Sequence, residues 1–518
     1  MVFALFYQPI LHAQVTLCST YGSQTPTHTV GVGSPNNITH SSQLGSSLPS
    51  GAVVNVVGDF IVNANFTLSG SVVKVNTGAK IFVEANGSFS LVFLMLNDTK
   101  VFACSGLWKG IELDNFTGIT TTNGTRIEDA ESAIKSTAGF ATLSIDNTTF
   151  NRNVIGINLE VPINTWWPPM LTLFVNNAFS CTSPLNGTTN GKTEVGVRMK
   201  NINYPLVFNY GNTNNTFKGL KNGMYMESDY MVMDLDNYRF LGIEYNCVEF
   251  RNGEQLFVKN CKFEDIKREG IITNNVRSLR VEDSEFLGNN SAPYTLYNRT
   301  MLHVLNPKVG NTNLIQRNVF TTSGDLNCLT FFHIMLEING GLNNQMNASI
   351  SANTFNLLNN FNTSNNFSLG SSVGVQVSSN YSTSSDVDIE NNDFILDINN
   401  SGSVWGNRAL DVRYGNKNNV HIIANRIKAG RGYYCSMVGS TGTGNEFSDN
   451  VFNQGQYGHL GYGLFLDNFK NTRICSNTNN AATVVAYHFN GQNDNTNFTS
   501  NTTYGNSEQN IRSYQFYE

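Results

Sequence analysis

Three six-residue segments, LDNYRF (235–240), VKNCKF (258–263) and VEDSEF (281–286), decide the fold of this chain. Their final phenylalanines lie 23 residues apart, and Phe217 precedes them at the same distance. Apolar residues stand seven and five places before the last three of these phenylalanines, at 240, 263 and 286, and alternate with mostly polar neighbours, which is the pattern of a half-buried strand. A 23-residue repeat of short strands, without helical periodicity, predicts one turn of a parallel β-helix.

The same phase continues along the chain with longer spacers. Seven further positions have an apolar residue five places earlier: Phe150, Phe179, Phe320, Phe355, Phe394, Ile427 and Phe452. Segment 51–116 has the same alternating character. We therefore predict an all-β, single-stranded parallel β-helix over residues 51–490, a solenoid of about 14–16 turns that forms one architecture.

Asparagine is far above its usual share of the sequence, and many copies stand two places before an anchor. We predict that their amides stack from turn to turn as a buried, hydrogen-bonded ladder. We also expect these asparagines to adopt the left-handed backbone conformation that a sharp bend needs. The expected ladder consists of Asn318, Asn353, Asn392, Asn425 and Asn450.

The ends of the chain differ from its middle. Residues 1–13 are expected to be the remnant of a signal peptide, cleaved after Ala13, although its basic region is missing. Residues 14–50 are expected to be a linker or cap, and residues 491–518 a C-terminal cap or tail. The eight cysteines contain no Cys-x-x-Cys pair, which disfavours zinc, and their disulfide pairing stays open.

The charge balance excludes several classes of function. The chain has 32 Lys and Arg against 38 Asp and Glu, a net charge of −6, and only 14% of its residues are charged. A weakly acidic chain without a basic run is a poor partner for nucleic acid or for anionic lipid. No stretch reaches 18 consecutive apolar residues, so no transmembrane helix is expected.

Segments 103–113, with Trp108-Lys109-Gly110 at its centre, and 126–134 resemble the secreted right-handed parallel β-helix proteins of Bacteroidetes. Those proteins belong to the pectin-lyase-like superfamily. The resemblance covers residues 51–490 and implies a right-handed coil. It implies no single activity, because this fold carries lyases, hydrolases, epimerases and non-catalytic surface proteins.

Outward-facing residues of one strand set offer candidate chemistry. Asp388, Glu390, His421 and Glu446 gather on one face over three turns without an intervening lysine or arginine. Paired carboxylates serve glycoside hydrolysis, retaining at about 5–5.5 Å apart and inverting at about 6.5–9.5 Å. Closer oxygens could instead hold Ca²⁺, and an ordinary solvated face is the third interpretation. The earlier outward residues of this set are expected to form a stabilising stack of ion pairs (Asp236, Lys259 and Glu282).

Trp166 and Trp167 precede two prolines in a spacer between turns. Adjacent indoles on a stiff loop could stack against a sugar ring, or the loop could fold back and bury them. Both interpretations stay open.

These features predict an exported or cell-surface monomer of structural or binding type, which recognises a polysaccharide or cell-surface glycan through its loops. The alternative is a polysaccharide lyase or glycoside hydrolase that acts in a groove. No cofactor is required, and Ca²⁺ is the one ion considered.

Overall fold

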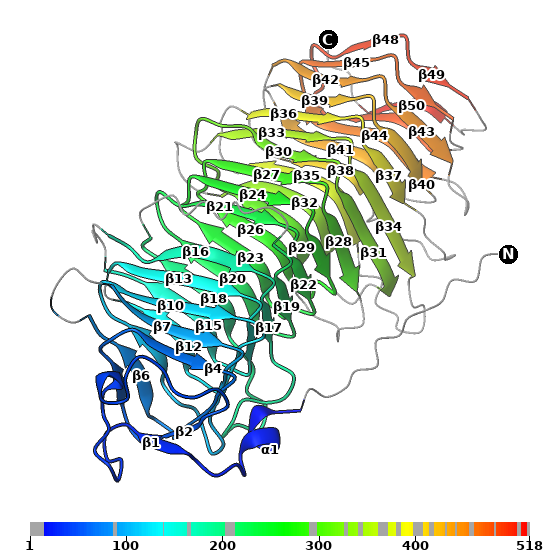
Figure 1. Ribbon diagram of the computed structural model, residues 1–518. Coiled ribbons are helices and arrows are strands. Elements are labelled where there is room, and N and C mark those ends of the chain that lie inside the picture. The colour runs from blue at the N-terminus through cyan, green and yellow to red at the C-terminus, as the bar shows by residue number, and fades with distance from the viewer. Residues whose placement is uncertain are drawn as a thin grey trace. The chain divides into compact units, whose positions relative to one another are not determined.

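The computed structural model describes residues 15–85, 87, 91–137, 139–162, 167–202, 213–289, 298–325, 330–339, 345–360, 371–379, 385–396, 408–413, 419–429, 433–440, 443–454, 460–480, 483–504 and 509–514. The chain divides into two compact units. Unit 1 holds residues 1–159 and 177–196, and unit 2 holds residues 160–176 and 197–518. Strands dominate both units (Figure 1).

Unit 1 coils through three strands per turn, and strands at equivalent places pair in parallel from one turn to the next. We call the three resulting surfaces the anchor face, the second face and the third face. The anchor face contains β1 (His28–Val30), β2 (Val53–Val56), β5 (Val72–Val75), β8 (Lys100–Phe102), β11 (Arg126–Glu128), β14 (Thr149–Asn151) and β17 (Ala178–Ser180). The second face contains β3 (Phe60–Val62), β6 (Lys80–Val83), β9 (Gly110–Leu113), β12 (Ser132–Ser136) and β15 (Ile155–Glu160). The third face contains β4 (Phe66–Ser69), β7 (Val92–Asn97), β10 (Thr117–Thr122) and β13 (Ala141–Asp146).

Unit 2 repeats this order. Its anchor face contains β19 (Thr216–Lys218), β22 (Arg239–Leu241), β25 (Lys262–Glu264), β28 (Glu285–Asn289), β31 (Val319–Asp325), β34 (Thr354–Asn360), β37 (Asp393–Leu396), β40 (Arg426–Ala429), β43 (Val451–Gln454), β46 (Thr478–Asn479) and β49 (Thr502–Thr503). Its second face contains β20 (Asn222–Glu227), β23 (Asn246–Arg251), β26 (Glu269–Asn274), β29 (Arg299–Leu305), β32 (Thr330–Ile338), β35 (Ser371–Ser379), β38 (Arg408–Arg413), β41 (Tyr433–Ser440), β44 (Leu460–Phe469), β47 (Thr483–Asn490) and β50 (Gln509–Tyr514). Its third face contains β21 (Val232–Asp236), β24 (Gln255–Lys259), β27 (Ser278–Glu282), β30 (Asn313–Gln316), β33 (Met346–Ser351), β36 (Ser385–Glu390), β39 (Val420–Ile423), β42 (Asn445–Ser448), β45 (Thr472–Cys475) and β48 (Asn497–Thr499). Two further strands are β16 (Met170–Val175) and β18 (Val195–Lys200). The predicted parallel β-helix is confirmed.

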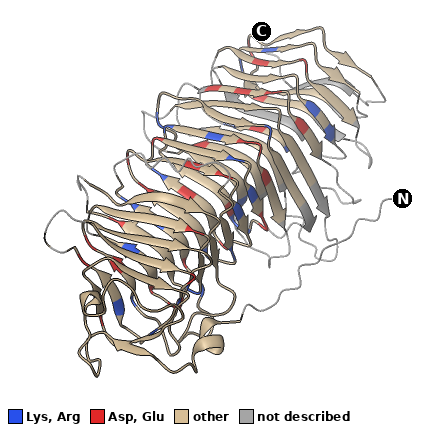
Figure 2. Ribbon diagram, in the orientation of Figure 1, with Lys and Arg blue, Asp and Glu red and all other residues tan. Residues whose placement is uncertain are grey.

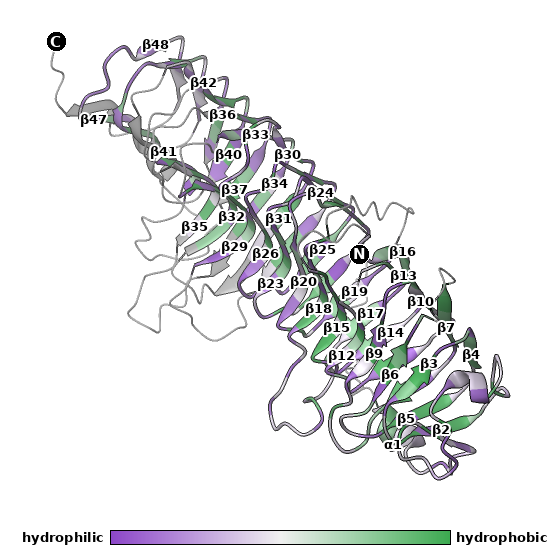
Figure 3. Cartoon of the chain, turned by 90° about the vertical axis from the view of Figure 1, so that its left-hand side faces the viewer, coloured by the Kyte–Doolittle hydropathy of each residue, from purple (hydrophilic) through white to green (hydrophobic). Residues whose placement is uncertain are grey.

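The anchor phenylalanines hold the interior of unit 2 together. Phe240, Phe263 and Phe286 pair in register and are completely buried. Their rings stack nearly parallel, with centroids 5.1 and 4.5 Å apart. Hydrophobic and hydrophilic residues alternate along the strands (Figure 3), because successive side chains point to opposite sides of a strand.

The asparagine ladder is confirmed. All five predicted members are at most 1% exposed. The amide of Asn392 accepts a hydrogen bond from Asn353 at 3.1 Å and donates one to Asn425 at 3.0 Å. The ladder continues beyond the prediction through Asn477 to Asn501.

The expected left-handed conformation of these asparagines is wrong. Positive φ occurs one place earlier, at residues such as Asn391 (54°), Arg317 (56°) and Ala352 (55°). The bend and the ladder are therefore made by two consecutive residues, one for the backbone angle and the next for the amide.

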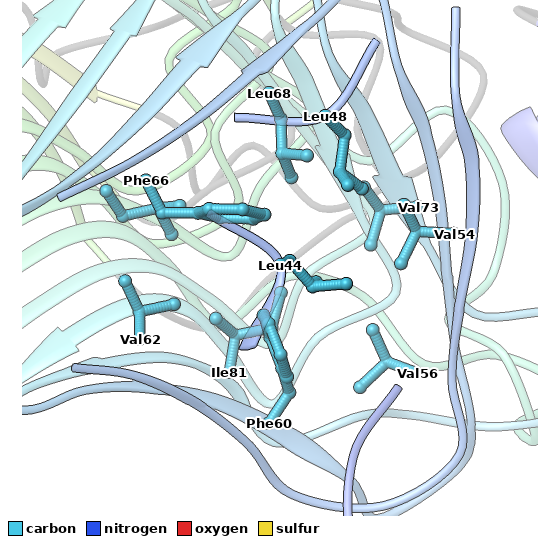
Figure 4. A pocket seen from close by; sticks show the side chains of 11 residues that line it. Leu44, Leu48, Val54, Val56, Phe60, Val62, Phe66, Leu68, Val73 and Ile81 are labelled. Atoms are coloured by element: carbon cyan, nitrogen blue, oxygen red, sulfur yellow. The ribbon is translucent and has the colours of Figure 1, made fainter. Parts of the chain in front are cut away.

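Residues 40–48 lie over the first turn of unit 1. The 3₁₀ helix η1 (Ser41–Gln43) brings Leu44 and Leu48 over the end of the apolar interior (Figure 4). The space left there is about 10 Å³ and lined only by apolar side chains, such as Phe60 and Phe66. A space of that size holds at most one water molecule and offers it no polar partner, so it is interior packing rather than a ligand site.

Residues of the segments that carry the family resemblance form a buried network in unit 1. Trp108 is fully buried, and its Nε1 donates to the Glu128 carbonyl at 2.8 Å. The Glu128 carboxylate accepts hydrogen bonds from Arg126, Asn151 and the backbone N–H of Leu17. Leu17 begins helix α1 (Leu17–Tyr21), which the Cys18–Cys104 disulfide also ties down. These residues stabilise the fold and offer no accessible chemistry.

None of the helices found in the described part of the chain is long and apolar enough to cross a membrane.

Candidate functional site on the third face of unit 2

The predicted acidic residues lie on the third face of unit 2. Asp388 on β36 pairs in register with His421 on β39, which pairs with Glu446 on β42. Arg473 on β45 continues this column, which we call the Asp388 column. Neighbouring strands lie about 4.8 Å apart, so the Cα atoms of Asp388 and Glu446 are separated by about 9.6 Å along the column.

Each carboxylate of the Asp388 column has a partner. Asp388 Oδ1 lies 2.8 Å from His421 Nδ1. Glu446 Oε1 accepts a hydrogen bond from Ser448 at 2.7 Å and lies 3.4 Å from Arg473. Both carboxylates of the Asp388 column are thus already engaged by neighbouring side chains.

Glu390 lies on the same outward side of β36 but in the next column, where it pairs with Ser351 and Ile423. A residue that the sequence prediction omitted, Asp386, joins Asp388 and His421 instead. One ligand atom from each of these three residues lies within 4.8 Å of the others.

Trp167 is 67% exposed, so the interpretation that the spacer buries its ring does not hold for this residue. Trp166 lies outside the described residues. Whether Trp167 binds a sugar stays a prediction.

An open hollow occurs further along the third face of unit 2, over β21, β24 and β27. We call it the Phe257 hollow; its volume is about 200 Å³ and its lining is Asp234, Phe257, Val258, Lys259, Arg280 and Glu282. Phe257 stands between the buried Leu256 and Val258, so its ring points outward. Asp234 and Arg280 pair with it in register, one on each side.

The ion pairs in this region differ from the predicted stack. Glu282 contacts Arg280 on its own strand and Arg317 at 3.3 Å, while Asp236 accepts a hydrogen bond from Asn260 at 2.8 Å. Within the described ranges, neither the carboxylate of Asp234 nor the ammonium of Lys259 makes a hydrogen bond or an ion pair, although the Lys259 charge acts to lower the pKa of Asp234. Two opposite charges thus remain available beside the ring, on a face where acidic and basic residues are interspersed (Figure 2).

The pKa values of the two carboxylates in the Phe257 hollow are shifted in opposite directions. Partial burial, together with the nearby charge of Asp236, raises the pKa of Asp234. Burial also acts to raise the pKa of Glu282, but the hydrogen bonds from Arg280 and Gln316 outweigh it and lower that pKa. Glu282 is therefore a fixed anion that orients Arg280, and Asp234 is the carboxylate open to a ligand.

Sequence reasoning missed a histidine between two glutamates on the second face of unit 2. His303 on β29 lies 3.1 Å from Glu337 on β32 and 3.5 Å from Glu269 on β26. Burial lowers the pKa of His303, but both glutamates raise it, and the result is about 9. The imidazolium is thus held as a donor and is a poor general base. Glu269, His303 and Glu337 follow one another at intervals of 34 residues, and the pattern behind the anchor phenylalanines does not include these positions.

Comparisons with known proteins give no family. No family model matches the chain, and no curated protein matches it. Among solved structures, a mutant tailspike protein of E. coli bacteriophage HK620 in complex with a hexasaccharide is similar at 9% identity, covering 90% of this chain and 70% of that one, with a TM-score of 0.28. The tailspike protein of the same bacteriophage with a pentasaccharide is similar at 10% identity, covering 89% and 72%, with a TM-score of 0.24. The A-module of the Azotobacter vinelandii mannuronan C-5 epimerase AlgE6 is similar at 9% identity, covering 89% and 92%, with a TM-score of 0.17. At such similarity, the site residues must be assigned from their own geometry.

Proposed function

We propose that the protein is an exported β-helix protein that binds a polysaccharide or cell-surface glycan, and that the Phe257 hollow holds one of its sugar rings. The observation that carries the proposal is an outward aromatic ring beside a carboxylate and an ammonium that make no hydrogen bond or ion pair with other described side chains. The apolar face of a sugar ring packs against an aromatic side chain, while its hydroxyl groups need both acceptors and donors.

The polar groups of the Phe257 hollow match these needs. Asp234 accepts hydrogen bonds, Lys259 donates them, and both are free of partners among the described residues. Arg280 is held by Glu282, so its remaining N–H groups are presented in a fixed direction. The hollow of about 200 Å³ is smaller than the usual 300–1,000 Å³ pocket for a drug-sized ligand, which favours one ring of a longer chain.

A hydrolase or lyase is less well supported. Asp234 and Glu282 lie two strands apart and in different columns, so their Cα atoms are separated by roughly 12 Å from strand spacing and rise. Glu282 is also committed to Arg280.

Export is supported by the Cys18–Cys104 disulfide. Disulfides persist in secreted and surface proteins, whereas cytosolic thiols are kept reduced.

The test is a binding assay of the full chain on immobilised polygalacturonate, alginate, xylan and mannan. For the polysaccharide that the wild type retains, Phe257→Ala should weaken affinity at least tenfold, and Asp234→Asn and Lys259→Ala several-fold each. Phe93→Ala is the matched control, because Phe93 is also a half-buried, outward phenylalanine of a third-face strand. Equal loss in the control, or full retention by Phe257→Ala, would overturn the site.

The same samples should be assayed for new reducing ends and for absorbance from unsaturated uronate. Under the binding proposal neither signal grows with protein concentration. Growth of either one would favour the enzymatic alternative.

A further inference from the structure

We propose that Asp386, Asp388 and His421 form a binding site for a divalent transition-metal ion of the Zn²⁺ type. The site is separate from the Phe257 hollow and does not depend on the proposed function. It would use three side chains that project from two adjacent strands of the third face, β36 and β39.

The orientation of the imidazole is the first argument. His421 Nε2 lies 3.1 Å from the carbonyl oxygen of Gly444. A carbonyl oxygen can only accept, so Nε2 must carry the proton. Metal-binding histidines commonly donate their second ring N–H to a backbone carbonyl in this way, which fixes the ring and the tautomer.

The contact on the other side of the ring is the second argument. His421 Nδ1 and Asp388 Oδ1 face each other at 2.8 Å, and a ligand atom of Asp386 lies within 4.8 Å of both residues' ligand atoms. A proton between Nδ1 and Oδ1 gives an ordinary hydrogen-bonded pair, whereas a metal ion at this point would be coordinated by both atoms.

The donor set selects the type of metal. Ca²⁺ and Mg²⁺ take oxygen ligands, whereas imidazole together with carboxylates suits Zn²⁺ and its neighbours. Two ligands at 2.0–2.1 Å from a tetrahedral ion lie about 3.4 Å apart. Asp388 and His421 would therefore separate by about half an ångström, and Asp386 would close the third position. Both side chains are partly exposed, at 40% and 32%, so this shift is not resisted by a packed interior.

The test is calorimetric titration of the chelator-treated full chain with ZnCl₂ alone and with CaCl₂ alone. We expect the wild type to bind one Zn²⁺ ion per chain. The affinity for Zn²⁺ should fall at least tenfold in Asp388→Asn and in His421→Ala. The wild type should bind Ca²⁺ at least tenfold more weakly than Zn²⁺. Circular dichroism should confirm that both variants fold.

Glu390→Gln is the matched control, because it removes one carboxylate from the same side of the same strand but outside the donor set. It should bind Zn²⁺ within twofold of the wild type. Absence of the Zn²⁺ site, its survival in His421→Ala, or preference for Ca²⁺ would each overturn the proposal.

Discussion

Ala352 sits at a bend with φ of 55°, although it has a Cβ atom that crowds the following carbonyl in this conformation. Asparagine or aspartate occupies most equivalent bends, because these side chains hydrogen-bond locally. We expect Ala352→Gly to increase the free energy of unfolding by about 1 kcal/mol. Ala348→Gly, in the interior of β33, should instead decrease it by about 0.5–1 kcal/mol. Urea denaturation of both variants measures the change in unfolding free energy. A change of the same sign in both variants would contradict the assignment of backbone strain to Ala352.

Asn392 occupies the middle of the buried ladder. Its Oδ1 accepts from the backbone and the amide of Asn353, so truncation leaves both donors without an acceptor. Asn392→Ala should therefore cost about 1–3 kcal/mol of unfolding free energy. Asn480→Ala, on an exposed asparagine, should change it by less than about 0.5 kcal/mol. Similar losses of unfolding free energy in both variants would show that an asparagine in the ladder stabilises the fold no more than an exposed asparagine does.

At the scale of the strand, the charged cluster of β26, β29 and β32 makes stability depend on pH. The pKa of His303 is about 9 in the folded chain against an ordinary 6.5, so the folded state binds this proton more tightly. The resulting stabilisation is complete below pH 6.5 and is lost as pH rises through 9. His303 is only 12% exposed, and we expect it to contribute about 2–3 kcal/mol.

The measurement is the difference in unfolding free energy between wild type and His303→Gln at pH 6.5 and at pH 10. Subtraction removes the contribution of all other titrating groups. The difference should shrink by about 2–3 kcal/mol at the higher pH. A difference that stays constant would show that the glutamates do not hold the proton on His303.

Strand positions and the columns behind each anchor could be predicted, because inward side chains repeat with the phenylalanines and few alternatives bury them. That is why Asp388, His421 and Glu446 were correctly placed in one column. Partner choice among outward side chains could not be predicted. Arg280 pairs with Glu282 on its own strand, so that, among the described residues, no ion pair engages the side chains of Lys259 and Asp234 beside Phe257. Such choices depend on side-chain reach, which a period-two pattern does not encode.

At the scale of the whole molecule, the Cys18–Cys104 disulfide closes a loop of 86 residues in unit 1. Cross-linking a loop of that length restricts the unfolded chain, which typically stabilises the folded protein by about 2–4 kcal/mol. Replacing both cysteines by serine should lower the unfolding free energy by that amount. The unfolding free energy of this variant should then be the same with and without dithiothreitol. Thiol titration that finds both cysteines free in protein isolated from outside the cell would contradict the bond.

The central claim, that the third face of unit 2 binds a sugar ring on Phe257, is tested most directly by a crystal structure with a bound oligosaccharide. The oligosaccharide should be taken from the polysaccharide that the wild type retains. We predict electron density for one ring stacked on Phe257, with hydroxyl groups within hydrogen-bond distance of Asp234 and Lys259. Density for the sugar elsewhere, with the Phe257 hollow empty, would contradict the claim.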